Sequence, residues 1–396
     1  MSKSFFKTFI HDLGDPDTTV ASDGLSSSEF TGYIDTGSYI LNAAVSGSLY
    51  GGIPNNKAVV FAGDPATGKT FFALGIVKSF LTDNKDGHVF YFDTESAVTN
   101  EMLTVRGIDI TRIAKSEPDS IEKFRHVAYK TLDAYVQLPE EKRFPLLMVL
   151  DSLSALPSKK ETEDMANDKN VRDMSKATLI KAAFRVLRLK LAKAKVPLIV
   201  TNHVYSVIGS YFPTKEMAGG QGAKYAADII VFLSKKKDRA ADKEVIGNIV
   251  KARMMKSRLT KEETVVETRI LFDGGLDRHY GLLALAVKQG CVKKVSTRYE
   301  FPNGAKVFEK AILREPEKYF TKDILDSVEV YIKEHFLYGS TGAPITDEEL
   351  EPDDEVEQDV IDPESGEMMI PGGETPREQA WFEEVTEEIE ETPEPD

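Results

Sequence analysis

One stretch of the sequence has the residue types and the spacing that bind a polyphosphate. It consists of Gly63, Asp64, Pro65, Ala66, Thr67, Gly68, Lys69 and Thr70. An apolar run over 58–62 precedes it, and apolar residues at helical spacing over 71–81 follow it. Between a strand and a helix, the N–H groups of such a loop converge on phosphate oxygens, the lysine reaches the terminal phosphates, and the threonine hydroxyl can bind Mg²⁺. The stretch therefore predicts a phosphate-binding loop rather than an ordinary glycine turn.

Two carboxylates follow later apolar runs. Glu95 comes just after the run 88–93, and Asp151 ends the run 145–151, about 80 residues beyond the loop. In an open α/β sheet, catalytic groups gather where buried parallel strands end, and an acidic strand end can position Mg²⁺ or its water. We therefore expect Asp151 and Thr70 to be the metal ligands of this site.

The segments between these residues predict an α/β fold with a mostly parallel, twisted sheet of about eight strands. Apolar runs alternate with amphipathic segments, such as 120–136 and 171–195, which is the pattern of βαβ units. The runs 228–233, 246–255 and 264–272 are joined by short polar turns, so we expect them to be antiparallel. The polar segment 158–164 and the segment between His203 and Gly219 are expected to be loops.

The charge is distributed unevenly along the 396 residues. The formal charge is −15, but residues 346–396 hold 22 acidic side chains against Arg377 alone, so this tail carries −21 and residues 1–345 carry about +6. A basic body is compatible with DNA, and the tail is either a competitor for a cationic surface or a solubilising appendage. The sequence has a single cysteine, Cys291, and no apolar run long enough to cross a membrane, so we expect an intracellular protein without disulfides.

These observations divide the chain into four expected parts. Residues 1–30 form an arm with aromatics at its start, 31–275 the α/β core with the phosphate-binding loop, 276–340 a small α/β domain with a hairpin turn at 302–304, and 341–396 a disordered acidic tail. Within the tail, Trp381 and Phe382 could form a docking peptide.

From about Asp35 to Phe320 the chain resembles RecA-family recombinases, in particular the UvsX recombinases of tailed bacteriophages. The resemblance rests on the phosphate loop and on five further segments, 35–38, 93–95, 150–153, 158–164 and 202–203, with Asp173 and Met174 between the last two. It implies a RecA-like ATPase core with two DNA-binding loops, at about 157–171 and 204–220.

The resemblance also implies roles at the nucleotide. ATP and Mg²⁺ are the expected ligands, and Glu95 is the expected general base for the attacking water. His203 takes the place of a glutamine that senses the γ-phosphate in RecA, and Met102 takes the place of a tyrosine that stacks on adenine. Lys256 and Arg258 align with two lysines that RecA projects toward the neighbouring subunit's ATP, although on residue type alone they could form a solvated strand edge.

DNA and a second copy of the chain are the expected partners. The positions that align with DNA contacts, or suit them by residue type, are Arg172, Tyr205, Tyr211, Phe212 and Lys215. Cationic and flat side chains are what single-stranded DNA requires. The resemblance implies a helical filament on single-stranded DNA that pairs with homologous duplex DNA, helped by a phage single-strand-binding protein and a loading mediator. It would work in the cytoplasm, that of the host cell if a phage encodes it, with no membrane partner.

Two other functions fit the same residues. One is a hexameric helicase motor, in which the core closes into a ring through the same head-to-tail contact. The other is a recombination scaffold that binds ATP without hydrolysing it, although the presence of both Lys69 and Glu95 counts against it.

Overall fold

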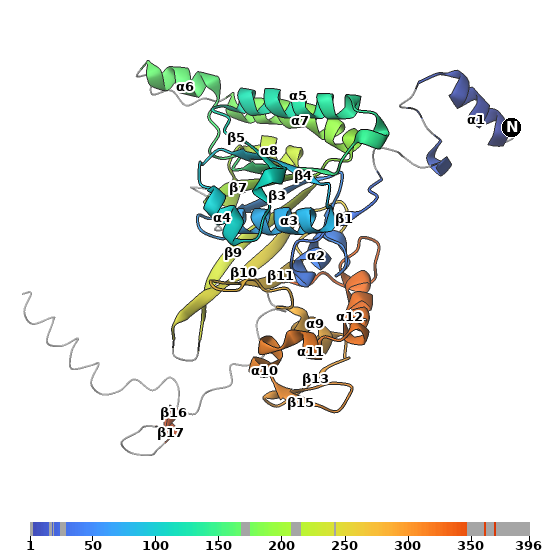
Figure 1. Ribbon diagram of the computed structural model, residues 1–396. Coiled ribbons are helices and arrows are strands. Elements are labelled where there is room, and N and C mark those ends of the chain that lie inside the picture. The colour runs from blue at the N-terminus through green and yellow to red at the C-terminus, as the bar shows by residue number, and fades with distance from the viewer. Residues whose placement is uncertain are drawn as a thin grey trace, which may run out of the picture. The chain divides into compact units, whose positions relative to one another are not determined.

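A mixed sheet of ten strands organises the structure, a computed structural model that describes residues 3–15, 18, 20–23, 29–167, 175–206, 215–240, 243–346, 360–361 and 368–369. The strand order is β12-β11-β10-β9-β3-β7-β6-β4-β5, with β8 paired to the end of β7. Figure 1 labels β3, β4, β5, β7, β9, β10 and β11 of this sheet. These strands are β3 (Ala58–Gly63), β4 (His88–Asp93), β5 (Ile113–Ser116), β6 (Leu146–Asp151), β7 (Leu198–Ser206), β8 (Lys215–Met217), β9 (Ile229–Arg239), β10 (Val245–Lys256), β11 (Val265–Leu271) and β12 (Gly275–Leu276).

Strand direction changes across the sheet as the sequence predicts. The strands β9, β3, β7, β6, β4 and β5 are parallel to one another, and β9, β10, β11 and β12 pair antiparallel. The expected fold class is confirmed, while the expected number of about eight strands is too low. The strands that were not predicted individually are β5, β8 and β12, because segments of two to four residues leave too little pattern to be recognised.

Helices cover both faces of the sheet. Those of the core are α2 (Tyr39–Ser46), α3 (Lys69–Asp83), α4 (Asn100–Val105), α5 (Ile121–Gln137), α6 (Lys159–Ala166), α7 (Lys176–Ala194) and α8 (Gly220–Ala226). Alternate residues of β3 face opposite sides, so Val59 and Phe61 pack in one apolar cluster with α3, and Val60 in another with α5 and α7. Every residue of β3 is buried, which fixes the strand that leads into the phosphate loop.

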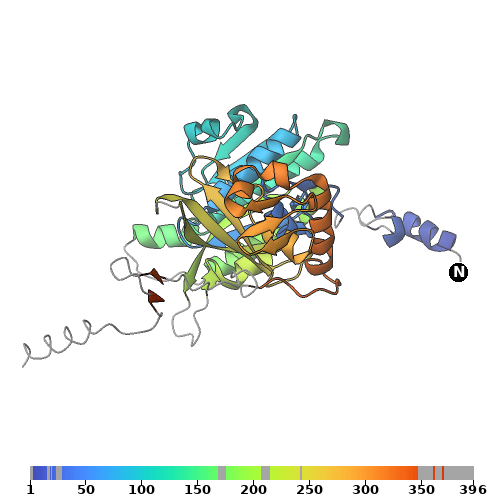
Figure 2. The ribbon, with the colours of Figure 1, turned by 90° about the horizontal axis from the view of Figure 1, so that it is seen from below.

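The segment after β12 packs on the same core cluster as α2. It contains α9 (Leu282–Lys288), β13 (Lys293–Val295), β14 (Arg298–Glu300), β15 (Lys306–Phe308), α10 (Glu309–Arg314), α11 (Pro316–Tyr319) and α12 (Lys322–His335). Val328 and Ile332 of α12 share a cluster with Ile40 of α2, and Figures 1 and 2 show the orange helices beside that part of the core. The predicted hairpin turn is present between β14 and β15, with Gly304 at φ +78°.

The start of α2 has a serine that does not cap its own helix. Ser38 occupies the N-cap position, but its hydroxyl makes no capping bond. It lies 3.2 Å from the Thr268 hydroxyl of β11 instead. The short strands β1 (Tyr33–Ile34) and β2 (Ile53–Pro54) pair antiparallel on either side of α2 along the chain.

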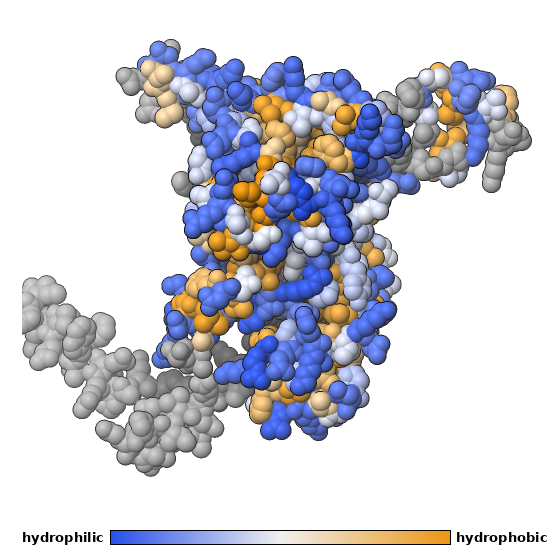
Figure 3. Space-filling model, viewed as in Figure 1, coloured by the Kyte–Doolittle hydropathy of each residue, from blue (hydrophilic) through white to orange (hydrophobic). Residues whose placement is uncertain are grey.

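The N-terminal helix α1 (Lys3–Asp12) exposes its aromatic residues. Phe5, Phe6 and Phe9 are 62%, 55% and 53% exposed, and apolar residues of α1 are visible on the surface in Figure 3. Elsewhere on that face, hydrophilic residues predominate and apolar residues form separate spots. Three exposed aromatics on one short helix are an unusual use of apolar surface.

The chain divides into two compact units, residues 1–350 and 351–396. In the second unit, β16 (Val360–Ile361) and β17 (Met368–Met369) pair antiparallel. Trp381 and Phe382 lie outside the described residues. Within the described part of the chain, no helix is both long enough and apolar enough to span a membrane.

Candidate nucleotide-binding site

The phosphate loop connects β3 to α3, and two of its glycines are required, Gly63 for lack of space and Gly68 for its positive φ. A Cβ atom on Gly63 would lie 2.6 Å from the carbonyl oxygen of Leu233. At Gly68, where φ is +90°, it would lie 2.9 Å from a side-chain atom of β11. The Thr67 hydroxyl donates to the carbonyl oxygen of Asp64 over 2.9 Å, which closes the turn. The predicted strand–loop–helix arrangement is therefore present, and its shape requires the glycines of the motif.

The Lys69 ammonium lies inside this loop. Its Nζ donates to the carbonyl oxygens of Gly63 and Asp64 over 3.0 and 2.9 Å. Burial lowers the pKa of Lys69, while the carboxylates of Glu95, Asp151 and Asp64 act in the opposite direction. Backbone carbonyls are weaker partners for a buried ammonium than an anionic phosphate. The loop therefore holds a cation that an incoming polyphosphate would stabilise.

The first turn of α3 adds backbone donors beside this cation. Its N-cap residue, Gly68, provides no side-chain capping bond, and the first N–H groups of a helix have no partner within it. Among the described residues, no three His, Cys, Asp or Glu side chains could hold a metal by themselves. A Mg²⁺ ion that arrives with phosphate oxygens and keeps its waters needs few protein ligands, so the assignment of Thr70 and Asp151 as its ligands stays a prediction.

His203 stands between the phosphate-loop lysine and the glutamate predicted as general base. Its Nδ1 lies 3.5 Å from Lys69 Nζ, and its Nε2 lies 3.5 Å from Glu95 Oε1. His203 reaches this position because β7 is parallel to β3 and pairs it with Gly63. The Glu95 carboxylate also accepts a hydrogen bond from Ser152 Oγ over 2.5 Å. Ammonium, imidazole and carboxylate thus form one line of contacts along the carboxyl edge of the parallel strands.

Both carboxylate oxygens of Asp151 already accept hydrogen bonds. The Tyr91 hydroxyl donates to Oδ2 over 2.8 Å, and the Thr201 hydroxyl donates to Oδ1. Burial, together with the charge of Asp151, raises the pKa of Tyr91 well above its usual value, so the phenol remains a donor. These bonds fix the orientation of the carboxylate, which suits a role in holding water around Mg²⁺.

Sequence reasoning missed the three side chains that hold the two carboxylates, Tyr91, Thr201 and Ser152. Tyr91 lies on β4 and Thr201 on β7, which flank β6 in the sheet. The signal that could have found them is the strand order, because it determines which polar side chains face Asp151.

A hollow of about 450 Å³ lies beside the first turns of α3. Phe71, Arg106 and the turn 272–275 contribute to its lining, and the Arg106 guanidinium lies 5.2 Å from the centre of the Phe71 ring. Met102 does not line this hollow. It packs against the core, and its carbonyl oxygen accepts a hydrogen bond from Arg106 over 3.1 Å. The predicted contact between Met102 and adenine therefore stays a prediction.

Comparison with known proteins adds the decisive observation. Residues 5–277, more than half of the chain, match the family model for the RecA N-terminal domain. The chain belongs to the RecA family. The resemblance to this family that its motifs show is thereby confirmed.

Individual relatives extend this result. A recombination and repair protein of Enterobacteria phage T4 is 31% identical over 255 residues, which cover 64% of this chain and 63% of the T4 protein. The RecA protein of Streptomyces venezuelae is 27% identical over 310 residues, 77% of each chain. The RecA protein of Thermotoga maritima is 27% identical over 269 residues, 68% of this chain and 71% of its own. The aligned part is thus less than two thirds of the T4 protein's length.

Two of the five predicted DNA-contacting residues of this RecA-family chain lie in the described part. Tyr205 on β7 is 60% exposed and follows closely after His203. Lys215 begins β8 and forms an ion pair with Asp64 of the phosphate loop. The other three lie outside the described residues, namely Arg172, Tyr211 and Phe212.

The polar segment 158–164 is helical where a loop was expected, so that prediction is wrong. Ser158 Oγ accepts a hydrogen bond from the Glu161 amide over 2.9 Å, and a Glu161 carboxylate oxygen accepts one from the Ser158 amide over 3.3 Å. This capping box starts α6. The prediction failed because it looked for a buried face, and α6 has no buried residue. Beyond α6, residues 168–171 of the predicted loop lie outside the described residues.

Lys256 and Arg258 lie at the amino ends of the parallel strands, which we call the amino edge, whereas the phosphate loop lies at their carboxyl ends. Lys256 pairs with Ile230 near the start of β9, whereas the phosphate loop begins at the last residue of β3. Two backbone carbonyls at the end of α8 accept hydrogen bonds from Lys256 Nζ over 2.7 and 2.8 Å. Arg258 Nε lies 3.5 Å from a carboxylate oxygen of Asp228. Neither cation is placed to serve the phosphate loop of its own chain.

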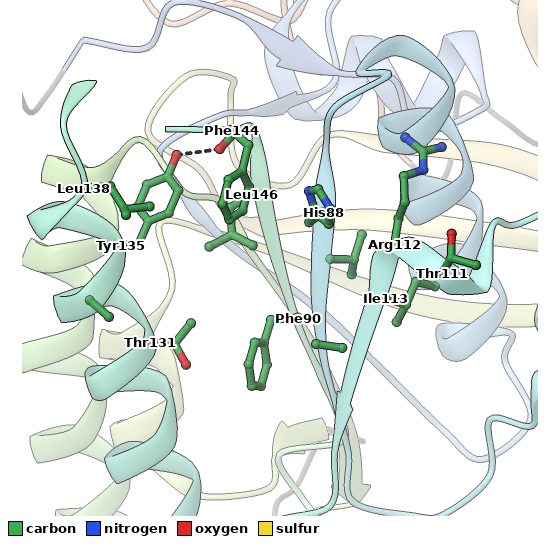
Figure 4. A pocket seen from close by; sticks show the side chains of 13 residues that line it. His88, Phe90, Thr111, Arg112, Ile113, Thr131, Tyr135, Leu138, Phe144 and Leu146 are labelled. Carbon is green, nitrogen blue, oxygen red and sulfur yellow. Dashed lines mark hydrogen bonds between the residues drawn. The ribbon is translucent and has the colours of Figure 1, made fainter. Parts of the chain in front are cut away.

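A second, mainly apolar cavity lies at the free edge of the sheet, between β5 and α5. Its volume is about 430 Å³, and Figure 4 shows Phe90, Leu138, Tyr135 and Phe144 around it. The Tyr135 hydroxyl donates to the carbonyl oxygen of Phe144 over 2.7 Å. Among the described strands, β5 pairs with β4 alone. Sequence reasoning missed this cavity, because the residues that line it come from four separate segments.

Proposed function

We propose that this chain is a DNA-dependent ATPase that assembles as a helical filament on single-stranded DNA and exchanges strands with a homologous duplex. The observation that carries the proposal is the position of His203. It contacts both Lys69 and Glu95, and it lies on the strand that leads into the segment resembling the second DNA-binding loop. ATP and DNA would thus contact the same strand, β7, or the segment that follows it. Binding of DNA would then change the ATP site, as DNA-stimulated hydrolysis requires.

At the nucleotide, different residues of this chain bind the phosphates, activate the attacking water and hold the metal ion. Lys69 and the first amides of α3 bind the phosphates, and Glu95 orients a water and takes its proton as the water attacks the γ-phosphorus, releasing ADP and phosphate. Asp151 and Thr70 would hold Mg²⁺, which supplies charge neutralisation of the phosphates. The bond from Ser152 keeps Glu95 aimed at this site.

His203 would report the state of the nucleotide to the DNA loop. A γ-phosphate that binds Lys69 competes for the ammonium that His203 faces at 3.5 Å. A shift of the imidazole moves β7, and Tyr205 lies close behind on the same strand. DNA that orders the loop after β7 would hold His203 in turn, because coupling between two binding sites is reciprocal.

The N-terminal helix supplies a route to assembly. Its exposed aromatics Phe5, Phe6 and Phe9 need an apolar partner, and the cavity beside β5 offers an apolar lining of suitable size. We propose that α1 of one subunit docks at this cavity of the next. A head-to-tail contact of this kind produces a helical polymer unless the rotation closes a ring.

The test is to measure ATP hydrolysis with and without single-stranded DNA while imaging the same samples by electron microscopy. DNA-stimulated hydrolysis with helical filaments is the expected result. Glu95→Gln should bind nucleotide and form filaments but hydrolyse ATP about 100-fold or more slowly, the range of a lost general base. Closed rings without filaments would favour the helicase motor, and no hydrolysis with saturating DNA would favour the scaffold.

A further inference from the structure

One buried carboxylate at the amino edge of the parallel strands has no role in the site described above. Asp228 lies just before β9, and its side chain is 4% exposed. Its amide donates to the carbonyl oxygen of Ala58 over 2.9 Å, and its Oδ2 accepts a hydrogen bond from the Ala58 amide over 3.2 Å. Asp228 is therefore locked to the first residue of β3, the strand that ends in the phosphate loop.

Two arginines from distant parts of the chain meet at this carboxylate. Arg188 of α7 places Nη2 2.6 Å from Asp228 Oδ1, and Arg258, beyond the end of β10, places Nε 3.5 Å from the same oxygen. The Arg258 side chain is 55% exposed and that of Arg188 is 34% exposed. Arg188 is thus the tightly held partner, and Arg258 is the one that can leave.

The surroundings carry an excess of positive charge. The cations whose electrostatic fields overlap here are Lys57, Arg188, Lys195, Lys256 and Arg258. Burial lowers the pKa of Lys57, the Asp228 charge raises it, and the neighbouring arginines lower it. The Asp228 carboxylate acts on both Lys57 and Lys256 and is opposed there by the charges of Arg188 and Arg258, so it lies among several cations. Such a cluster is suited to an additional anion.

The cluster cannot serve the nucleotide of its own subunit. Asp228 sits beside the first residue of β3, and the phosphate loop begins at the last, Gly63, about 16 Å farther at roughly 3.3 Å per residue. The edge on which the cluster lies is the one that carries Lys256 and Arg258.

We propose that Asp228 is an internal counter-anion of a polyphosphate site at this edge. It holds Arg188 and Arg258 in the free subunit and yields Arg258 to the triphosphate of a nucleotide bound by a second copy of this chain. The inference rests on the proposed function, because it takes Lys256 and Arg258 as the cations that face the neighbour. It adds Arg188 to that set as a phosphate ligand and assigns Asp228 as a positioning residue that competes with the phosphate.

The test measures how much slowly hydrolysed ATP analogue, adenosine 5′-O-(3-thiotriphosphate), the full chain needs for half-maximal assembly on oligo(dT), by light scattering. Asp228→Asn keeps an acceptor for the Ala58 amide but removes the competing charge, so the required concentration should fall roughly fivefold. Arg188→Gln removes a phosphate ligand, so the concentration should rise roughly fivefold. A purely structural role would raise it in both variants, and that result, or no change in either, would overturn the proposal.

Arg188→Lys tests the cluster without touching Asp228, should Asp228→Asn fail to fold. It keeps the charge and should assemble near the wild-type concentration, whereas a defect as large as that of Arg188→Gln would show that Arg188 acts through packing and would refute the proposal. DNA phosphate is the other possible source of the anion. The slope of log affinity for oligo(dT) against log salt, measured without nucleotide, should stay unchanged in Arg188→Gln, and a slope reduced by about one would assign the cluster to DNA instead.

Failure of the proposed function would show differently. A wild-type chain that does not assemble with nucleotide and oligo(dT) would remove the basis of both proposals. Wild-type assembly with no opposite response of Asp228→Asn and Arg188→Gln would overturn only the inference about Asp228.

Discussion

The two edges of the parallel strands carry opposite arrangements of charge. At the carboxyl edge, a buried ammonium, Lys69, is surrounded by the carboxylates Glu95, Asp151 and Asp64. At the amino edge, a buried carboxylate, Asp228, is surrounded by the cations described above. Each edge thus has one central charge and an excess of the other sign around it, and β3 connects the two.

Under the proposed function, this contrast would let copies of the chain associate. A phosphate chain bound at the carboxyl edge adds negative charge, and the amino edge of a second copy offers the positive charge that complements it. A contact between two different edges is heterologous and continues from copy to copy. The nucleotide would then lie between subunits and hold the contact closed, so that its hydrolysis weakens the contact.

The largest effect on ATP hydrolysis is expected from removing the central cation of the carboxyl edge. Lys69→Ala leaves the carboxylates of the carboxyl edge without their counter-charge and takes a donor from the phosphates. We expect ATP hydrolysis with single-stranded DNA to fall at least about 100-fold, as when a key electrostatic donor is lost, measured as phosphate release at saturating ATP. Lys130→Ala, which removes an exposed lysine on α5, is the control and should keep wild-type activity. Near-normal hydrolysis in Lys69→Ala would exclude the phosphate loop from the reaction.

Mixing two defective subunits tests whether the carboxyl edge of one copy and the amino edge of another form one site. Lys69→Ala damages the carboxyl edge and Arg258→Ala the amino edge, so each variant should be inactive by itself. In an equal and random mixture, about a quarter of the contacts combine two intact edges, and hydrolysis should recover to about that fraction. Activity of Arg258→Ala alone at the wild-type level, or no recovery in the mixture, would contradict a site shared between subunits.

The two edges also differ in how much the sequence can predict. The phosphate loop was predicted residue by residue because strand, loop and helix are contiguous, and Gly63, Gly68 and Lys69 act on their immediate neighbours. The cluster at Asp228 joins α7, the start of β3 and the end of β10, and no local pattern brings Arg188 to that carboxylate. Long-range contacts of this kind depend on strand order and register, which periodicity does not determine.

Between these extremes lie residues whose neighbourhood was predicted but whose partners were not. The resemblance placed His203 near the nucleotide, while its contacts with Lys69 and Glu95 follow from the pairing of β7 with β3. The helix α6 was missed although its Ser158 and Glu161 have the spacing of a capping box, because a helix without a buried face produces no periodic signal.

The smallest effect is expected at the ion pair between Lys215 and Asp64. It joins β8, which lies within the second predicted DNA-loop segment, to the carboxyl edge, but both side chains are nearly half exposed, 45% and 44%. An exposed pair contributes about 0.2–1 kcal/mol. Lys215→Ala and Asp64→Ala should each lower DNA stimulation of hydrolysis by less than about fivefold, and the double variant should be no worse than either.

Ionic strength separates this pair from a direct DNA contact by Lys215. If the pair itself transmits the signal, the difference between wild type and either variant should shrink as salt rises, since exposed charges are screened. Lys318→Ala, which removes a comparably exposed ion pair with Glu315 in the C-terminal segment, is the matched control and should not change DNA stimulation. Additive losses in the double variant would show that Lys215 and Asp64 act separately. The nucleotide site would then be coupled to the DNA loop through His203 alone.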